Sequence, residues 1–338
     1  MDGNEQRNDW RRKLYYRLNS GKNSKLLYYT ASVARLAVPG CLLRPMLKGK
    51  LAAIDRRPDR DYILDRADYY CKLGSGGGTT YDRELWQRES VSIKEQQYTP
   101  QKVYYYDAMR YARWFPPRLR WVLAPGDVSW NLPLPSIVKS RPVGEGNERS
   151  VLLKLDAIRH YIFTHDRKPW REKKDMAIFR GGIVGKRRLE IRKPFMERWH
   201  GHPMFDIGVL DPEFPDWYTG RMTIREHLDY KFIIALEGND VASNLKWVMS
   251  SNSIAVMPRP QTETWYMEGR LIPNYHYIEI KPDFSDAAER LQHYIDHPEE
   301  AEEIIKHQHE WLAQFRDTRR ETLISLLVLD RYFKATNE

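Results

Sequence analysis

The stretch Phe232-Ile-Ile-Ala-Leu236, which leads into Glu237-Gly238-Asn239-Asp240, decides the fold of this chain. An apolar run of five residues that ends at small and polar residues is typical of a strand buried on both faces of a sheet. The same pattern recurs at residues 176–179, 204–207, 253–257 and 277–280. Helices are predicted at residues 187–199, 241–249, 286–296, 299–315 and 319–334. Short apolar strands that alternate with helices predict an α/β fold with a parallel sheet between layers of helices.

The composition is typical of a globular protein with a large core and a polar surface. The chain has 338 residues, of which 41% are hydrophobic and 30% are charged, and this length suggests two domains. No apolar run reaches the ~18 residues of a membrane span, and the first residues lack the apolar core of a secretory signal. Two cysteines, Cys41 and Cys71, are too few for a disulfide framework or a cysteine-based zinc site. We therefore expect a protein of the reducing cytoplasm.

Positive charge is concentrated near the N-terminus. Residues 1–50 contain eleven Lys and Arg residues against three acidic ones, and the formal net charge of the whole chain is +9. Leu and aromatic residues are interleaved with these basic residues, as in a helix that lies on an anionic bilayer. A helical arm whose apolar face packs on the body of the protein has the same pattern, so both interpretations stay open.

Basic residues and glycines gather where the strand at 176–179 ends. Phe179-Arg180-Gly181-Gly182 is followed by Gly185-Lys186-Arg187-Arg188, which opens a predicted helix. Ligands bind at the carboxyl ends of strands in such a sheet, and a helix N-terminus with basic side chains attracts phosphate. The spacing is not that of a dinucleotide-binding fingerprint. A tight turn before a solvated basic helix is the alternative interpretation.

Two further strand ends carry polar side chains. The segment after the strand at 232–236 supplies Asn239, Ser243, Asn244 and Lys246. Asn239 or Asp240 is also suited to capping the helix that follows. Glu268 follows the strand at 253–257, where it either binds ribose hydroxyls or faces solvent.

Several short motifs in the second half of the chain form a recognisable set. They are Phe-Arg-Gly-Gly at 179–182, His227 with Tyr230-Lys231, Leu236-Glu237-Gly238, Asn244-Leu245-Lys246, Ser251-Asn252-Ser253, Leu271-Ile272-Pro273 and His276-Tyr277. With this set, about half of the chain resembles glycosyltransferase family 90, also called the Cap10-like or lipopolysaccharide-modifying family. Residues 236–247 and 263–277 are most similar to the bacterial branch, which adds hexose to the lipopolysaccharide core.

The resemblance implies a GT-B-like architecture of two Rossmann-like domains with parallel sheets, the second one regular. We expect a basic helical arm at residues 1–50, an acceptor-binding domain at 51–170, a nucleotide-sugar-binding domain at 171–315 and a C-terminal helix at 316–338. It also implies an inverting transferase that needs no cofactor and no metal. The sequence agrees in that no convincing Asp-x-Asp motif lies at a strand end.

The resemblance further implies a donor site for a UDP-sugar, with UDP-glucose and UDP-galactose both open. Arg180, Gly181, Lys186 and Arg187 are expected to hold the diphosphate. The remaining donor residues are expected to be Gly182, His227, Asn239, Ser243, Asn244, Lys246 and Glu268. Eukaryotic members usually carry an arginine where Asn244 stands, so Lys246, or Lys186 with Arg187, would compensate.

An inverting transfer needs a base near the acceptor hydroxyl. Asp127 is the candidate, because it follows a predicted strand upstream of the Phe-Arg-Gly motif, as the base of the family does. An aspartate in a Pro-Gly-Asp turn is the alternative. Asp206, Asp211 and Asp216 are weaker candidates for the base, and Lys139 and Arg141 are expected to contact acceptor phosphates.

The predicted function is transfer of a hexose, glucose or galactose, from a UDP-sugar to a lipopolysaccharide core or related glycan. We expect the protein in the cytoplasm, peripheral on the inner face of the bacterial inner membrane and bound through its arm to an anionic surface. A nucleic-acid-binding protein that uses the basic arm is one alternative, although no nucleic-acid-binding signature is present and we expect no nucleic-acid partner. A non-catalytic membrane scaffold is the other. The missing Walker Lys-Ser/Thr argues against a kinase.

Overall fold

The computed structural model describes residues 11–12, 14–74 and 80–337, so the start of the predicted arm lies outside the described residues. The chain divides into two compact units, each built from segments far apart in the sequence. The first, called here the sheet unit, consists of Met1–Asn23, Arg159–Arg259 and Leu271–Leu312. The second, called here the helical unit, consists of Ser24–Ile158, Pro260–Arg270 and Ala313–Glu338. These units differ from the four consecutive segments that we predicted, and the arm is divided between them.

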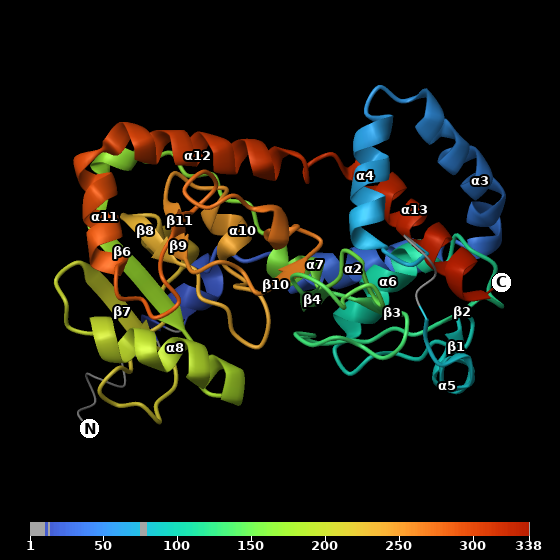
Figure 1. Cartoon of the computed structure of the whole chain (residues 1–338), viewed down its shortest axis with the longest axis horizontal. Helices are drawn as coiled ribbons and strands as arrows, with labels where there is room; N and C mark the ends of the chain where they lie inside the picture. Colours follow the sequence, from blue (N-terminus) through green and yellow to red (C-terminus); the bar gives the residue numbers. More distant parts are fainter. Residues whose placement is uncertain (1–10, 13, 75–79, 338) are drawn as a thin grey trace. The chain divides into compact units, whose positions relative to one another are not determined.

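The sheet unit contains the parallel sheet that the apolar runs predict (Figure 1). Its strands are β6 (Lys174–Gly181), β7 (Phe205–Val209), β8 (Tyr230–Ile234), β9 (Ile254–Met257) and β11 (Ile278–Glu279). They pair in the order β11-β9-β8-β6-β7, and every pairing is parallel. The α/β fold with a parallel sheet is therefore confirmed for this unit.

Helices in this unit bury the faces of the strands. The principal ones are α8 (Lys186–Trp199), α11 (Ala287–Asp296) and α12 (Pro298–Ala313), and shorter elements are η2 (Trp170–Glu172), α9 (Ile224–His227) and α10 (Leu245–Val248). Phe195 of α8 is fully buried and makes edge-on ring contacts with Phe179 of β6 and Phe205 of β7. The helix predicted at 241–249 shortens to α10, because the Asn244 side chain donates to the Ile234 carbonyl and holds the preceding residues in a turn.

The helical unit has no large sheet among its described residues. Its helices are α2 (Lys25–Ala37), α3 (Gly40–Ala52), η1 (Ala53–Arg56), α4 (Arg60–Tyr70), α5 (Arg83–Glu89), α6 (Lys102–Ala112), η3 (Glu268–Arg270) and α13 (Thr318–Asn337). Helix α7 (Ala157–His160) lies where the chain leaves this unit. Strands form three pairs, β1 (Val91–Ser92) with β2 (Arg120–Trp121), β3 (Ser136–Val138) with β5 (Ser150–Leu152), and β4 (Ser140–Pro142) with β10 (Thr262–Thr264).

This differs from the second Rossmann-like domain that we expected in the N-terminal half. The strands there are two or three residues long. Pro133 and Pro135 stand just before β3, where their fixed backbone angle and missing N–H prevent a longer strand.

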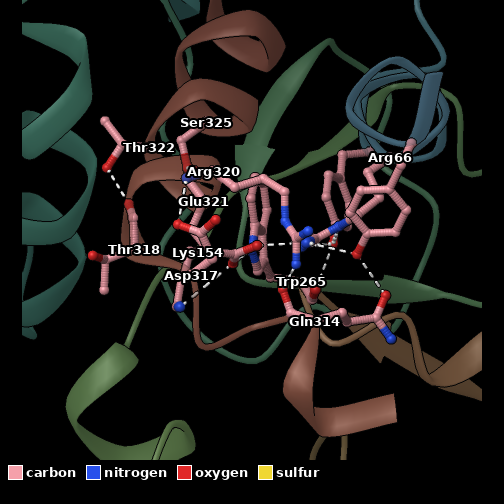
Figure 2. A network of polar contacts seen from close by, with 12 residues as sticks. Arg66, Lys154, Trp265, Gln314, Asp317, Thr318, Arg320, Glu321, Thr322 and Ser325 are labelled. Carbon is pink, nitrogen blue, oxygen red and sulfur yellow. Dashed lines mark hydrogen bonds and ion pairs between the residues drawn. The ribbon is translucent and has the colours of Figure 1, made fainter. Parts of the chain in front are cut away.

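A buried ion pair fastens distant segments of the helical unit together (Figure 2). The Arg66 guanidinium of α4 lies 2.5 Å from the Glu321 carboxylate of α13, and both side chains are buried. The Trp265 indole donates to the other Glu321 oxygen at 2.6 Å and stacks on Tyr70 with ring centroids 3.9 Å apart. A charged pair removed from water needs such additional hydrogen bonds, and here they attach Pro260–Arg270 and α13 to α4.

Candidate functional site

The strand order of the sheet unit reverses between β6 and β8. In open parallel sheets, ligands bind outside the carboxyl ends of the strands at such a point. Strand β6 ends at Gly181 and leads into α8, and β8 ends at Ile234 and leads into the loop at 235–244. The structure thus brings together the first two polar strand ends that the sequence indicates.

Arg187 joins these two strand ends. Its Nη2 donates to the Glu237 carboxylate at 2.5 Å, and its Nη1 donates to the carbonyls of Gly238 and Asp240 at 3.1 and 3.3 Å. The side chain remains about a quarter exposed, at 24%. The predicted diphosphate ligand Arg187 therefore lies where the strand order reverses between β6 and β8, called here the switch point of the sheet.

The start of α8 is electropositive. Gly185 precedes the helix with a φ of 115°, a backbone conformation that favours glycine, and no side chain caps the helix. Lys186 is exposed, Arg188 is half-buried, and the amides of the first turn carry the positive end of the helix dipole. Asn239 is exposed nearby, with its Oδ1 3.7 Å from the position of a Cβ built on Gly185. Such a combination suits a phosphate group.

Arg192 also lies at this point, and we did not predict it. Its guanidinium donates to the carbonyls of Gly182, Leu236 and Glu237 at 2.6 to 2.9 Å. Burial lowers the pKa of Arg192 to about 10, and the like charge of Arg188 adds to this shift. The signal in the sequence is its place on the inward face of α8, one turn before the buried residues Phe195 and Met196.

Close packing of protein side chains explains why glycines stand at positions 181 and 238. A Cβ on Gly238 would lie 3.1 Å from Arg192 Nη2, and a Cβ on Gly181 would lie 2.7 Å from the Phe179 ring. The glycines at both strand ends thus make room for side chains of the protein itself, a role that requires no ligand.

Asp211 holds the loop between β6 and α8. Its Oδ2 accepts from the amides of Ile183 and Val184, the latter at 3.2 Å. The sequence predicts Asp211 as a weaker candidate for the base, and in the structure its carboxylate holds this loop in place. Because its carboxylate occupies these amides, the cationic side chains and the start of α8 are left as the groups for a phosphate.

Arg180 and Asp206 form a separate polar cluster. Successive side chains of a strand point to opposite faces, and Phe179 contacts Phe195 of α8, so Arg180 points to the other face. There its Nη2 lies 2.5 Å from an Asp206 oxygen, and the Tyr230 hydroxyl donates to the same carboxylate. Burial opposes the ionisation of Asp206, but these hydrogen bonds outweigh it and lower its pKa.

His227 lies at the amino end of β8. The strand runs for five residues between His227 and the loop of Glu237, or roughly 17 Å at ~3.3 Å per residue. Its Nδ1 is 2.8 Å from the Thr223 carbonyl oxygen, and its ring contacts Trp247 edge-on. Burial lowers the pKa of His227 below its ordinary value, so the imidazole is neutral near pH 7. The structure does not bring His227 to the donor residues at the switch point.

The other predicted donor residues are distributed unevenly. Ser243 is exposed, Asn244 is half-buried, and Lys246 on α10 is fully buried. Glu268 belongs to the helical unit, where its buried carboxylate accepts from the Thr264 amide at 2.6 Å and from its hydroxyl. Glu268 thus caps its own turn.

Asp127, Lys139 and Arg141 also belong to the helical unit. The Lys139 ammonium is buried and contacts the Asp127 carboxylate, whose side chain remains 20% exposed. Arg141 is fully buried and binds the Glu263 carboxylate at 2.8 Å and the Tyr69 carbonyl at 2.6 Å. Both cations are therefore held by protein partners, which differs from the acceptor contacts that we expected.

The chain is similar to a known protein family and to individual proteins. The sequence profile described as "Glycosyl transferase family 90" matches residues 149–327, which include β6, β8 and α8. The chain is 41% identical over 232 residues to the O-glucosyltransferase LpsA of Dichelobacter nodosus, and the alignment covers 68% of this chain and 72% of that protein. It is 27% identical over 171 residues to uncharacterized protein 027R of Frog virus 3 (isolate Goorha), which covers 40% of this chain and 17% of the viral protein.

The extent of these matches decides the classification. The family profile spans more than half of the chain, and the bacterial relative aligns over more than two thirds of it. The chain therefore belongs to glycosyl transferase family 90 and is a glycosyltransferase.

Proposed function

We propose that this protein transfers a hexose, with glucose first and galactose second, from a UDP-sugar to a lipopolysaccharide core or related glycan. The bacterial relative is an O-glucosyltransferase, which supports glucose as the transferred sugar. The observation that carries the donor assignment is the positively charged start of α8 at the switch point, where Lys186 and Arg187 open the helix and Arg187 contacts the loop that follows β8. A diphosphate is the group that such a site recognises.

The proposed reaction is a single displacement with inversion and without a metal. The acceptor hydroxyl attacks the anomeric carbon, a new C–O bond forms, and the bond from that carbon to the diphosphate oxygen breaks. Asp127 takes the proton of the hydroxyl, and Lys139 positions its carboxylate. Arg187 and Lys186 stabilise the negative charge that develops on the departing UDP.

We further propose that the reaction takes place in the cytoplasm, on the inner face of the bacterial inner membrane. Both cysteines are unpaired, as in a reducing compartment.

The test is transfer by the purified protein from UDP-glucose or UDP-galactose to truncated lipopolysaccharide, with and without EDTA. We expect glucose to be transferred equally well in EDTA, and the anomeric configuration of the product, measured by NMR, to be opposite to that of the donor. Retained configuration would refute the single displacement, and loss of activity in EDTA would refute metal independence.

Two variants separate binding from catalysis. Asp127→Asn should lower turnover by at least about a hundredfold and leave UDP affinity unchanged, because a general base contributes about that much or more. Asp330→Asn is the matched control, since the Asp330 side chain is 19% exposed and also pairs with a lysine, Lys334 of α13. Full turnover in Asp127→Asn would remove Asp127 as the base.

A further inference from the structure

Helix α2 is attached to the helical unit through polar contacts on one side. The Tyr28 hydroxyl donates to Asp107 of α6 at 2.6 Å, and Ser32, one turn later, is buried. The Tyr29 ring contacts Tyr106 edge-on at 5.8 Å. Residues 28 and 32 thus define the inward face of the helix, and the residues opposite them face outward.

The outward face of α2 and the neighbouring α3 is apolar. Leu26 and Leu27 are 76% and 71% exposed, and Leu42 of α3 is 61% exposed. Val33, two turns after Leu26, and Met46, one turn after Leu42, are also more than half exposed. Large apolar side chains that are this exposed, and that recur at intervals of one or two helical turns, are unusual for a surface that faces only water.

The charge of these helices has a single sign. Residues 24–54 contain Lys25, Arg35, Arg44, Lys48 and Lys50 and no acidic residue. Two copies of this surface would bring like charges together, which disfavours self-association. Exposed leucines surrounded by lysine and arginine match an anionic lipid surface, where acyl chains take the apolar side chains and phosphates take the charges.

The lengths of the helices determine how they meet a membrane. Among the described residues no single helix has the length and hydropathy to cross a bilayer, although Lys25–Ala37 and Gly40–Arg56 meet both criteria as a pair bent by 88°. Helices α2 and α3 have 13 residues each, fewer than the ~20 that a straight span needs. We propose that α2 and α3 lie in the plane of an anionic bilayer surface, with Leu26, Leu27 and Leu42 inserted among the lipids. This inference is independent of the donor site.

The test is flotation of the full chain with vesicles of phosphatidylcholine, alone or mixed with phosphatidylglycerol. We expect binding to the mixed vesicles and little binding to phosphatidylcholine alone. A variant with Leu26→Gln, Leu27→Gln, Leu42→Gln and Met46→Gln should partition at least about tenfold more weakly, because the inserted apolar area is removed. A chain that stays unbound with the mixed vesicles at low salt would overturn the proposal.

The control variant replaces apolar residues of other segments that are also more than half exposed, as Tyr98→Gln, Tyr218→Gln and Ile272→Gln. It should bind vesicles as the parent does. Circular dichroism and UDP titration of both variants check the fold and show that a failure of lipid binding is distinct from a failure of the donor site. Two results would show that the surface does not bind lipid. In the first, the variant with Leu26, Leu27, Leu42 and Met46 replaced floats as well as the parent. In the second, light scattering shows that the parent is a dimer and this variant a monomer.

A charge variant tests the electrostatic part of the proposal. Lys25→Gln with Lys48→Gln should reduce binding to phosphatidylglycerol vesicles several-fold, since each basic residue near the surface adds to the attraction. Equal binding of this variant and the parent would contradict the role of the basic residues.

Discussion

Arg187 and Glu237 form a short ion pair, with Nη2 and Oε2 2.5 Å apart, that joins the first turn of α8 to the loop after β8. In a site that binds a diphosphate, the Glu237 carboxylate competes with the ligand for the same guanidinium. The pair therefore keeps a cation at the switch point and at the same time reduces its availability.

Opposite effects on UDP affinity are expected from the two partners. Arg187→Ala should weaken UDP binding by about 10- to 100-fold, because a charge-assisted hydrogen bond is worth about 1.5–3 kcal/mol. Glu237→Gln removes the competing charge and should leave UDP affinity equal or increase it. Titration calorimetry measures both.

Lys193→Ala is the control for the charge of α8, since Lys193 is exposed on the same helix and pairs with Glu197. It should bind UDP as the parent does. If Arg187→Ala also binds UDP normally, the diphosphate does not contact this residue.

Arg180 is expected to stabilise the sheet unit and to contribute little to UDP binding. Arg180→Ala leaves the partly buried Asp206 carboxylate without its cation, which should cost about 1–3 kcal/mol of unfolding free energy in urea titrations. UDP affinity should change by less than about threefold, because Arg180 points to the sheet face opposite α8. A stable Arg180→Ala protein that has lost UDP binding would return Arg180 to the diphosphate site.

The buried ion pair of Arg66 and Glu321 should contribute far more to the free energy of unfolding than an ion pair on the surface does. Glu321→Gln leaves a buried guanidinium without its counter-charge, and such a loss costs about 3–5 kcal/mol. Glu302→Gln is the control, since its partner Arg171 is exposed and surface pairs contribute little. Urea denaturation of the two variants compares them, and similar midpoints would contradict the importance of the buried network.

Asp107 should make stability depend on pH. Burial raises the pKa of Asp107 to about 6, so the folded protein binds a proton more tightly than the unfolded chain does. The resulting stabilisation is complete below the unfolded pKa near 4 and is lost as the pH rises through about 6, with a size on the order of 2–3 kcal/mol.

Asp107→Asn should remove this component. Other carboxylates have the opposite effect. Hydrogen bonds from Arg57 and Arg270 lower the pKa values of Asp59 and Asp65, so the stability that these two groups contribute is lost as the pH falls. The informative quantity is therefore the difference between variant and parent in urea titrations at pH 5 and pH 7.5. A difference that does not change with pH would show that Asp107 is not the titrating group.

Local patterns in the sequence determined the parallel sheet, the helices after it and the family. The runs at 176–179 and 232–236 predict strands β6 and β8 because hydrophobic periodicity is a property of neighbouring residues. The motifs around Glu237 predict family 90 and a glycosyltransferase, both of which the comparisons confirm. The nucleic-acid-binding and scaffold alternatives are not supported by these matches.

Only the tertiary structure decided which basic residues meet. Arg180 and Arg187 are seven residues apart and were assigned to one ligand, yet the alternation of a strand turns Arg180 to the far face of the sheet. Arg192, in the middle of α8, donates hydrogen bonds to three carbonyls from the loops that follow β6 and β8. Arg66 finds Glu321 at a separation of 255 residues. A sequence pattern records what each residue is, whereas the partner of a charge is determined by how distant segments pack.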